Sequence, residues 1–357
     1  MATVSLCMIV KNEGGNIADC LDCAKKIVDE IIIVDTGSTD DTKEIAKRYT
    51  DKIYDFEWCD DFAAARNYSY SFATQDYIMW LDADDIIDDE NIAKFIEYKD
   101  KITDDDVIMM RYATQTNDRG EYTFSFFRER MSKRVNNYRW HEPVHEYLEK
   151  SGKIVQADIV IKHNKHTRSY SDRNMKIYEK QIEEGKTLST RGLYYYAREL
   201  YSFRRYKASL DMYLDFFSRK DGWVEDRISA CEGMADCCSS LGDDKKALVT
   251  LFQSFLYDTP RAEICCKIGY IYKKQNDWKK ALYWFKSVLA LEKPKTWGFI
   301  RAEFWDYIPL AECVVCCDKL GDIDKAEEYN EKVAELRPDS ASVEYNRQYF
   351  RKKRAQQ

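Results

Sequence analysis

A group of acidic side chains follows a buried-looking run of apolar residues. In YIMWLDADD (77–85), an apolar stretch suited to a strand covered on both faces leads directly into Asp82, Asp84 and Asp85. Two unit charges about 4 Å apart repel each other by roughly 4 kcal/mol at an effective dielectric constant near 20. A divalent cation removes that repulsion, and Mg²⁺ or Mn²⁺ typically binds one or two carboxylates together with phosphate oxygens. The pattern therefore predicts a cation and diphosphate site at the end of this strand, built on Asp82 and Asp84.

More acidic residues follow in the same stretch, and a helix start explains them. Asp88, Asp89 and Glu90 stand before the helical pattern NIAKFIEYK. Acidic side chains there accept backbone N–H groups and favour the positive end of the helix dipole. We assign these three to helix capping. Asp82 still belongs to the strand, so the same explanation suits it less well.

The segments around the aspartates alternate between strand patterns and helical patterns. Apolar runs predict strands at 4–10, 30–35, 77–82 and 106–113, and helical patterns fill 15–28 and 39–49. Strands alternating with helices indicate an α/β fold with a mainly parallel sheet, whose ligands lie beyond the carboxyl ends of the strands. The first two strands also end in polar residues, KNE (11–13) and DTGS (35–38). Three polar strand ends on one edge of the sheet predict a binding site there.

After about residue 170 the strand patterns give way to a helical repeat. Ala247 and Ala281 follow GDDKK and NDWKK and are 34 residues apart, which is the tetratricopeptide period. Ala326 follows GDIDK after a longer gap, which indicates an insertion around KTWGFIRAEFWD (295–306). A weaker unit at 193–217 would make four helix pairs. The repeats could present an acceptor, or serve as a stacking scaffold or dimer surface.

Composition narrows the class of protein. Of the 357 residues, 45% are hydrophobic and 33% charged, as in ordinary globular proteins. Residues 1–170 carry ten more acidic than basic side chains, which argues against nucleic-acid binding. The 12 cysteines include adjacent pairs in helical stretches, so we expect packing rather than disulfides. With no signal-peptide pattern and no run of 18 apolar residues, we expect a cytoplasmic protein without a transmembrane segment.

Four stretches in this order resemble a known family: VSLCMIVKNE, IIIVDTGSTDDT, FAAARN and YIMWLDADD. Over roughly residues 3–165 the chain resembles the family 2 glycosyltransferases of the GT-A fold. The resemblance implies a Rossmann-like α/β domain at 1–168, and an all-α tetratricopeptide-like domain would follow at 169–357. It also implies a nucleotide-sugar donor, usually a UDP-sugar, inversion at the anomeric carbon, and Mn²⁺ or Mg²⁺ as cofactor.

The resemblance further implies roles for single residues around the donor. The turn from Ile9 to Glu13 and Asp35 would hold the nucleobase and ribose, Arg66 would approach the base or diphosphate, and Asp82 would approach the ribose. Asp84 would bind the metal, with His163 after a late strand as a second ligand. The residues so placed at the donor are Ile9, Lys11, Asn12, Glu13, Asp35, Arg66, Asp82 and Ala83.

Inverting transfer also needs a general base for the acceptor's proton. The stretch YRWHEPVHEYLEK (138–150) holds the candidates. The pair His145 and Glu146 fits the His-Glu pattern that related enzymes with helical repeats carry here, and Glu142 is the alternative. A strand with alternating polar edges would explain the same residues without catalysis.

A family 2 domain followed by repeats is similar to bacterial enzymes that glycosylate peptides or proteins, including S-glycosyltransferases of bacteriocins. This implies a UDP-sugar donor, with UDP-glucose and UDP-N-acetylglucosamine considered first, and a Ser, Thr or Cys side chain as acceptor. Related enzymes assemble cell-surface polysaccharide or lipopolysaccharide instead. Two readings from other classes are a nucleotidyltransferase and a non-catalytic repeat adaptor. The repeats could also form a homodimer.

Overall fold

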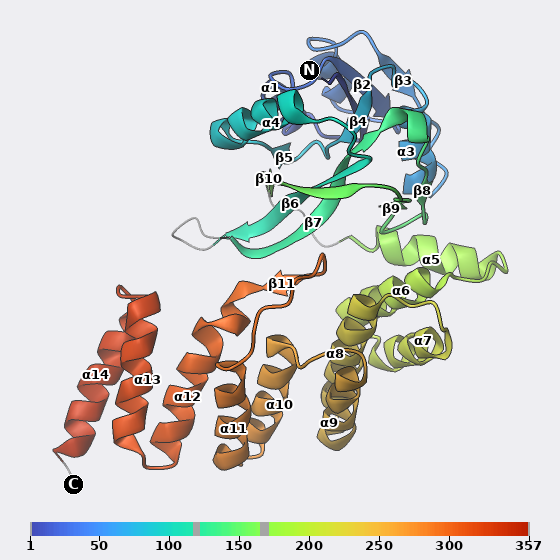
Figure 1. Cartoon of the computed structure of the whole chain (residues 1–357). Coiled ribbons are helices and arrows are strands. Elements are labelled where there is room, and N and C mark those ends of the chain that lie inside the picture. Colours follow the sequence, from blue (N-terminus) through green and yellow to red (C-terminus); the bar gives the residue numbers. More distant parts are fainter. Residues whose placement is uncertain (1, 117–121, 165–170, 356–357) are drawn as a thin grey trace. The chain divides into compact units, whose positions relative to one another are not determined.

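The computed structural model describes residues 2–116, 122–164 and 171–355, and the chain divides into two compact units (Figure 1). The first unit comprises residues 1–188 and the short segment 297–300, and the second comprises 189–296 and 301–357. The boundary predicted between residues 168 and 169 lies outside the described residues. Helix α5 (Arg173–Glu183), which we placed with the helical domain, falls in the first unit.

The first unit is an α/β domain, as predicted. Its main sheet runs in the order β3-β2-β1-β4-β7-β6-β10-β5. Strands β1, β2, β3 and β4 are parallel neighbours, β6 and β10 are parallel to each other, and β7 and β5 run antiparallel to their neighbours. The strands are β1 (Val4–Val10), β2 (Glu30–Asp35), β3 (Ile53–Asp55), β4 (Tyr77–Trp80), β5 (Asp85–Ile86), β6 (Val107–Thr116), β7 (Tyr122–Lys133) and β10 (Ile154–His163), with β8 (Trp140–His141) and β9 (Tyr147–Leu148) forming a separate pair.

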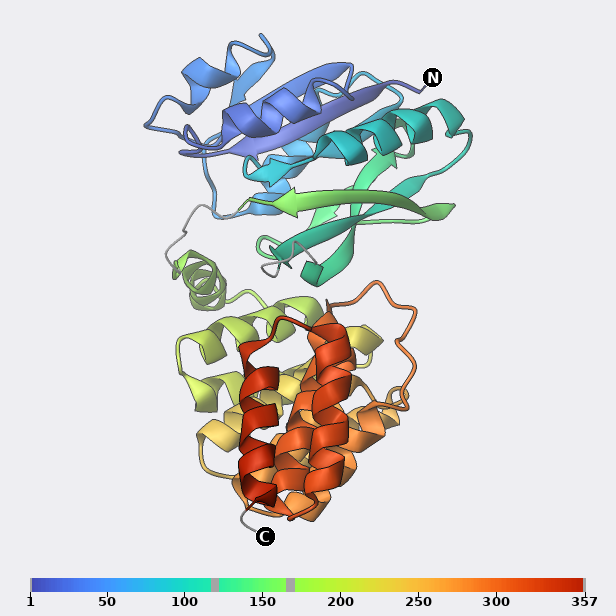
Figure 2. The ribbon, with the colours of Figure 1, turned by 90° about the vertical axis from the view of Figure 1, so that its left-hand side faces the viewer.

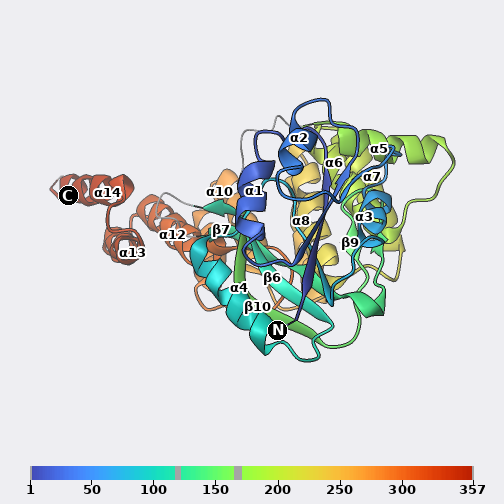
Figure 3. The same ribbon diagram turned by 90° about the horizontal axis from the view of Figure 1, so that it is seen from above.

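Side chains of the central strands alternate between two buried faces, which is why these strands read as continuous apolar runs. On β4, Met79 joins the core beneath α1 (Ile17–Ala24), α2 (Thr42–Ala46) and α4 (Asp89–Lys101). Its neighbour Trp80 packs on the other face with Trp140 and with α3 (Phe62–Tyr70). Seen from above, α1 and α4 lie on one side of the sheet and α3 on the other (Figure 3). Because β1, β2 and β4 are parallel, their carboxyl ends meet at one edge.

The second unit consists of helix pairs, which the 34-residue period predicted. Its helices are α6 (Thr190–Ser202), α7 (Tyr206–Ser218), α8 (Val224–Ser240), α9 (Asp244–Gln253), α10 (Ala262–Lys274), α11 (Trp278–Val288), α12 (Tyr307–Lys319), α13 (Ile323–Leu336) and α14 (Ala341–Arg354). The orange and red helices toward the C-terminus run side by side (Figure 2). The repeat motifs have a physical role: Asp243, Asp277 and Asp322 cap the second helix of their pairs. The alanines that follow are fully buried where two helices meet.

The predicted insertion folds onto the first helices of two pairs. Within the second unit, the Thr296 hydroxyl donates to Glu225 of α8 at 2.8 Å. Arg301 donates to Glu232 of α8 at 2.5 Å, and the Arg301 amide donates to Glu263 of α10 at 3.2 Å. The segment 297–300, in contrast, counts with the first unit, where the ring of Phe299 stacks on Phe124 at 5.6 Å between centroids.

The cysteines are free, and all but Cys59 are buried, so packing explains them as expected. The helices that the structure describes are too short or too polar to cross a lipid bilayer.

Candidate active site

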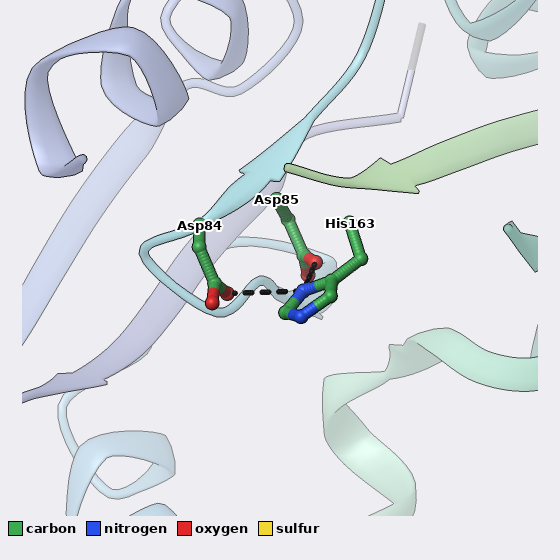
Figure 4. Close-up of side chains that lie close together, drawn as sticks. All are labelled: Asp84, Asp85 and His163. Carbon is green, nitrogen blue, oxygen red and sulfur yellow. Dashed lines mark ion pairs between the residues drawn. The ribbon is translucent and has the colours of Figure 1, made fainter. Parts of the chain in front are cut away.

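Three side chains that can bind a cation converge at the carboxyl end of β4. Asp84 lies in the turn after β4, Asp85 begins β5, and His163 ends β10 (Figure 4). Asp85 and His163 are paired residues of the antiparallel β5–β10 ladder, which brings a residue from far along the chain to the aspartates. Their ligand atoms lie within 4.8 Å of one another. The fold thus unites Asp84 and His163, the two residues expected at the metal, and adds Asp85.

The electrostatics of this cluster follow from its short distances. His163 Nδ1 lies 3.3 Å from Asp84 Oδ1 and 3.9 Å from Asp85 Oδ1. The nearby carboxylates of Asp84 and then Asp85 raise the pKa of His163 to about 9 despite partial burial. Without a cation, the imidazolium therefore supplies the positive charge between the carboxylates. A metal ion would take the place of that proton, because a histidine ligand must be neutral.

A carboxylate oxygen of Asp85 that lacks a hydrogen bond indicates that the cluster fits a divalent cation. Its side chain is fully buried, yet among the described residues its Oδ1 atom has no hydrogen-bond partner. A buried carboxylate oxygen without a partner is costly, and a cation would satisfy it. Two carboxylates and one imidazole are a donor set that Mn²⁺ accepts, and Mg²⁺ prefers the oxygens.

Arg66 of α3 lies beside this cluster and joins two acidic residues. Its Nη2 donates to Asp82 at 2.9 Å and its Nε donates to Glu146 at 2.7 Å. The guanidinium also lies over the rings of Trp80 and Trp140, with its Cζ at 4.4 and 4.9 Å from their centroids. Arg66 is almost completely buried, and its Nη1 has no hydrogen-bond partner within the described chain. A buried N–H donor left over in this way suits an anionic ligand.

Asp82 is held ionised in this setting. Burial opposes its charge, but the guanidinium groups of Arg66 and then Arg130 outweigh burial and lower the pKa of Asp82 to about 2. The carboxylate is partly exposed, with 38% of its side chain accessible. Asp82 is therefore ionised at neutral pH and can accept hydrogen bonds from a ligand hydroxyl, while the neighbouring Ala83 is buried.

Hydrogen bonds join the segments that follow β1 and β2. Asn12 has a positive φ of 54°, its amide donates to Ser38 Oγ at 2.9 Å, and its side-chain oxygen accepts from the Thr39 amide at 2.8 Å. The Glu13 amide donates to Thr42 Oγ1 at 2.8 Å. Ile9 is half-buried and Lys11 is exposed. The residues expected at the nucleobase, from Ile9 to Glu13, therefore lie at the end of β1 and in the loop that follows it, which hydrogen bonds join to the segment after β2.

Asp35 is the last residue of β2, and one of its carboxylate oxygens accepts hydrogen bonds while the other lacks a partner among the described residues. Its Oδ1 accepts the amides of Gly37 and Ser38, each at 2.8 Å. Its Oδ2 is buried and lacks a hydrogen-bond partner within the residues that the structure covers. The local turn thus fixes the carboxylate and leaves one acceptor available to a ligand N–H or hydroxyl.

The three candidate bases lie in the hairpin of β8 and β9. Glu142 and His145 have positive φ values of 71° and 55°. Such values are uncommon for residues other than glycine, and they often mark functional segments. Glu146 is the candidate that pairs with Arg66, which places it at the site of Asp82.

The sequence analysis assigns no role at the cation to Asp85, Tyr112 or Arg130. The Tyr112 hydroxyl lies 3.0 Å from His163 Nδ1, and Arg130 pairs with Asp85 at 2.8 Å. A charged residue within a buried strand would be a usable signal for Arg130. The strands predicted from the sequence do not include β7, so this signal is missing.

Comparisons with known proteins relate each part of the chain to a known family or repeat. Residues 5–154 match the model of glycosyl transferase family 2, and residues 315–340 match a tetratricopeptide repeat model. A TPR repeat-containing protein of Synechococcus elongatus is 34% identical over 151 residues, which are 42% of this chain and 36% of that protein. The SPbeta prophage-derived glycosyltransferase SunS of Bacillus subtilis is 39% identical over 94 residues, which are 26% of this chain and 22% of that protein.

The chain thus spans about a third or less of the length of these two curated relatives. Among solved structures, the C-terminal part of a TPR repeat-containing protein from Cytophaga hutchinsonii is similar, with a TM-score of 0.38 and 17% identity. That likeness covers 46% of this chain and 58% of the other.

Proposed function

The chain carries a glycosyl transferase family 2 domain followed by tetratricopeptide repeats, and on this premise we propose a specific reaction. The protein is an inverting, metal-dependent glycosyltransferase that moves a sugar from a UDP-sugar to a Ser, Thr or Cys side chain of a peptide or protein. The observation that carries the proposal is the cluster of Asp84, Asp85 and His163, which lies at the carboxyl edge of the sheet. In α/β sheets this edge is where ligands bind.

The donor would lie along the strand ends. The free oxygen of Asp35 would accept a hydrogen bond from the base or ribose, and Asp82 would accept one from a ribose hydroxyl. Asp84, Asp85 and His163 would hold Mn²⁺ or Mg²⁺, which when bound neutralises the charge that develops on the departing diphosphate. Arg66 would direct its free N–H toward the same anion.

The proton of the acceptor would go to a carboxylate of the β8–β9 hairpin. In the reaction the acceptor oxygen or sulfur forms a bond to the anomeric carbon while the bond from that carbon to the diphosphate breaks. The displaced acceptor proton is taken by Glu146, the candidate that lies against Arg66 at 2.7 Å. The pair with Arg66 keeps Glu146 next to Asp82, where a base must lie to reach the proton it takes. Glu142 remains the alternative base.

The repeats would present the acceptor. Helical repeats form extended surfaces suited to peptides, and α8 and α10 carry the charged residues Glu232, Asp236 and Lys267 on one connected face. Part of that face is covered by Arg301 of the insertion. An acceptor would therefore contact the insertion or the faces beside it.

A panel of nucleotide sugars tests the proposal. We expect release of UDP from one UDP-sugar by slow hydrolysis, dependent on Mn²⁺ or Mg²⁺, and faster release when an acceptor is added. Formation of pyrophosphate from UTP and a sugar phosphate would point to a nucleotidyltransferase instead. If the chain binds no nucleotide sugar and releases no nucleotide, the non-catalytic repeat adaptor is the remaining function. Labelled sugar that appears in lipid-linked saccharide rather than in protein would favour polysaccharide assembly.

Removal of residues 225–357 is expected to separate donor from acceptor. UDP-sugar hydrolysis should remain measurable, because the described donor-site contacts all lie before residue 165, whereas KM for the protein acceptor should rise sharply. Circular dichroism must first show that the fragment is folded. The truncation also removes Phe299 from Phe124, so Phe299→Ala in the full chain is the matched control. A folded truncation with unchanged acceptor kinetics would reduce the repeats to a scaffold or dimer surface.

A further inference from the structure

Arg130 of β7 is a completely buried charge that the proposed reaction does not use. Its side chain and that of Asp85 are each 0% exposed, and Arg130 Nη1 donates to Asp85 Oδ2 at 2.8 Å. Burying two charges is costly, and a well-packed apolar pair is often at least as stable. Stability alone is therefore a weak reason for this ion pair.

Two aromatic rings fix the guanidinium from the neighbouring strands. Its Cζ lies 3.9 Å from the ring centroid of Trp80 on β4 and 4.3 Å from that of Tyr112 on β6. Its Nη1 also donates to the Trp80 carbonyl at 3.4 Å, whereas its Nε and Nη2 have no hydrogen-bond partner among the described residues. The two rings therefore flank the guanidinium plane. A planar cation stacked in this way has little freedom to rotate.

This fixed guanidinium orients Asp85. Asp85 Oδ2 accepts Arg130 Nη1 and also the Asp82 amide, at 3.0 Å. With both donors on one oxygen, the other oxygen, Oδ1, is the one that lies toward His163, at 3.9 Å. Oδ1 is also the buried atom without a hydrogen bond. Arg130 thus presents a single, unshared carboxylate oxygen to the cluster.

The same guanidinium supports the second side of the cluster. The Tyr112 ring that it contacts carries the hydroxyl that lies 3.0 Å from His163 Nδ1. Arg130 therefore contacts Asp85 and Tyr112, and Tyr112 in turn contacts His163. Its hydrogen bond goes to Asp85 Oδ2, not to Oδ1, the oxygen that faces the cluster. Partners of metal ligands that act in this way typically change metal affinity 10- to 100-fold when they are replaced.

We propose that Arg130 is a positioning residue of the cation site, which sets Asp85 as a third ligand and braces His163 through Tyr112. The inference rests on the proposed function for the presence of the cation. It adds that the affinity for the cation depends on an arginine that contacts neither the cation nor the donor.

The test is a titration of the full-length, metal-free chain with Mn²⁺, with and without UDP, in which electron paramagnetic resonance measures free Mn²⁺. Arg130→Met is expected to weaken Mn²⁺ binding by about 10- to 100-fold. Arg130→Lys should fall between it and the wild type, because lysine keeps the charge but not the stacked plane. Arg111→Met is the matched control, because Arg111 of β6 also lies over an aromatic ring, that of Phe127. This substitution is expected to leave the affinity for Mn²⁺ unchanged.

Arg130→Met leaves Asp85 buried without its partner and could fail to fold, so Arg130→Lys, which keeps a cation beside Asp85, keeps the test decisive. Circular dichroism and thermal melting first show that Arg130→Lys is folded like the wild type. If Arg130 serves only stability, folded Arg130→Lys will bind Mn²⁺ as tightly as the wild type. We expect it to bind more weakly, because lysine cannot keep the stacked guanidinium plane that orients Asp85.

The outcomes separate this inference from the proposed function. A wild-type chain that binds Mn²⁺ while a folded Arg130 variant binds it equally well would overturn the inference alone. A wild-type chain that binds no Mn²⁺, even with UDP present, would overturn the cation assignment and this inference with it. Weaker binding in the Arg130 variants together with unchanged binding in Arg111→Met is the supporting result.

Discussion

Asp84→Ala is expected to lower turnover of the UDP-sugar donor by roughly 10³-fold or more. A bound cation contributes several kcal/mol of charge stabilisation to the departing diphosphate, and each 1.36 kcal/mol changes the rate about tenfold. Asp84 Oδ1 is the carboxylate oxygen nearest to His163, so its loss leaves the cluster with one carboxylate and one imidazole. Release of UDP, measured with and without EDTA, is the assay.

The matched control is Asp88→Ala, four residues further along the chain, after β5. Asp88 accepts the Asn91 amide at 3.0 Å as the N-cap of α4, which confirms the capping role predicted for it. Its loss should lower the free energy of unfolding by about 1 kcal/mol and leave donor turnover largely intact. Full activity of Asp84→Ala, or of the wild type in EDTA, would contradict the proposal that a metal bound at Asp84 is needed for the reaction.

Glu146→Gln is expected to lower sugar transfer by about 10²- to 10⁴-fold, the usual range for loss of a general base. The substitution is informative because a glutamine oxygen can still accept the Arg66 Nε that now donates to Glu146 at 2.7 Å. Arg66 and Asp82 should therefore stay in place, and donor binding, measured by calorimetry with UDP, should hardly change. With a thiol acceptor the loss should be milder, since a few per cent of cysteine is already thiolate at pH 7.

Two further variants decide which carboxylate is the base. Glu149→Gln serves as the control, because Glu149 is exposed and contacts His141 rather than Arg66. If Glu142→Gln is inactive while Glu146→Gln transfers normally, the base moves to Glu142. Glu146 would then be a residue that only positions Arg66.

The elements that carry the cation site could largely be predicted, because each is local. The apolar run of β4 followed by three aspartates is visible in one stretch, and parallel strands bring their carboxyl ends together by geometry. The meeting of His163 with these aspartates followed from the family resemblance, whereas the physical cause is the β5–β10 pairing. Asp85 was missed because its role depends on Arg130, which comes from β7, an antiparallel strand in the middle of the sheet.

The pairing of Arg66 with Glu146 could not be predicted for the same reason. The two residues are 80 positions apart, and their contact depends on the packing of α3 against the β8–β9 hairpin. The repeats show the opposite case. Asp277 as a cap and Ala281 at a close helix approach are local rules repeated with a fixed period, so the helix pairs were predictable. The contacts of the insertion were not, because Arg301 and Glu232 obey no period.

The most direct test of the central claim is the position of manganese in crystals grown with UDP and Mn²⁺, located by anomalous diffraction. The account predicts one strong Mn²⁺ peak bounded by Asp84, Asp85 and His163, with the diphosphate of UDP on its open side and the uridine beside Asp35. A Mn²⁺ peak elsewhere, or UDP bound away from the carboxyl ends of β1, β2 and β4, would contradict it.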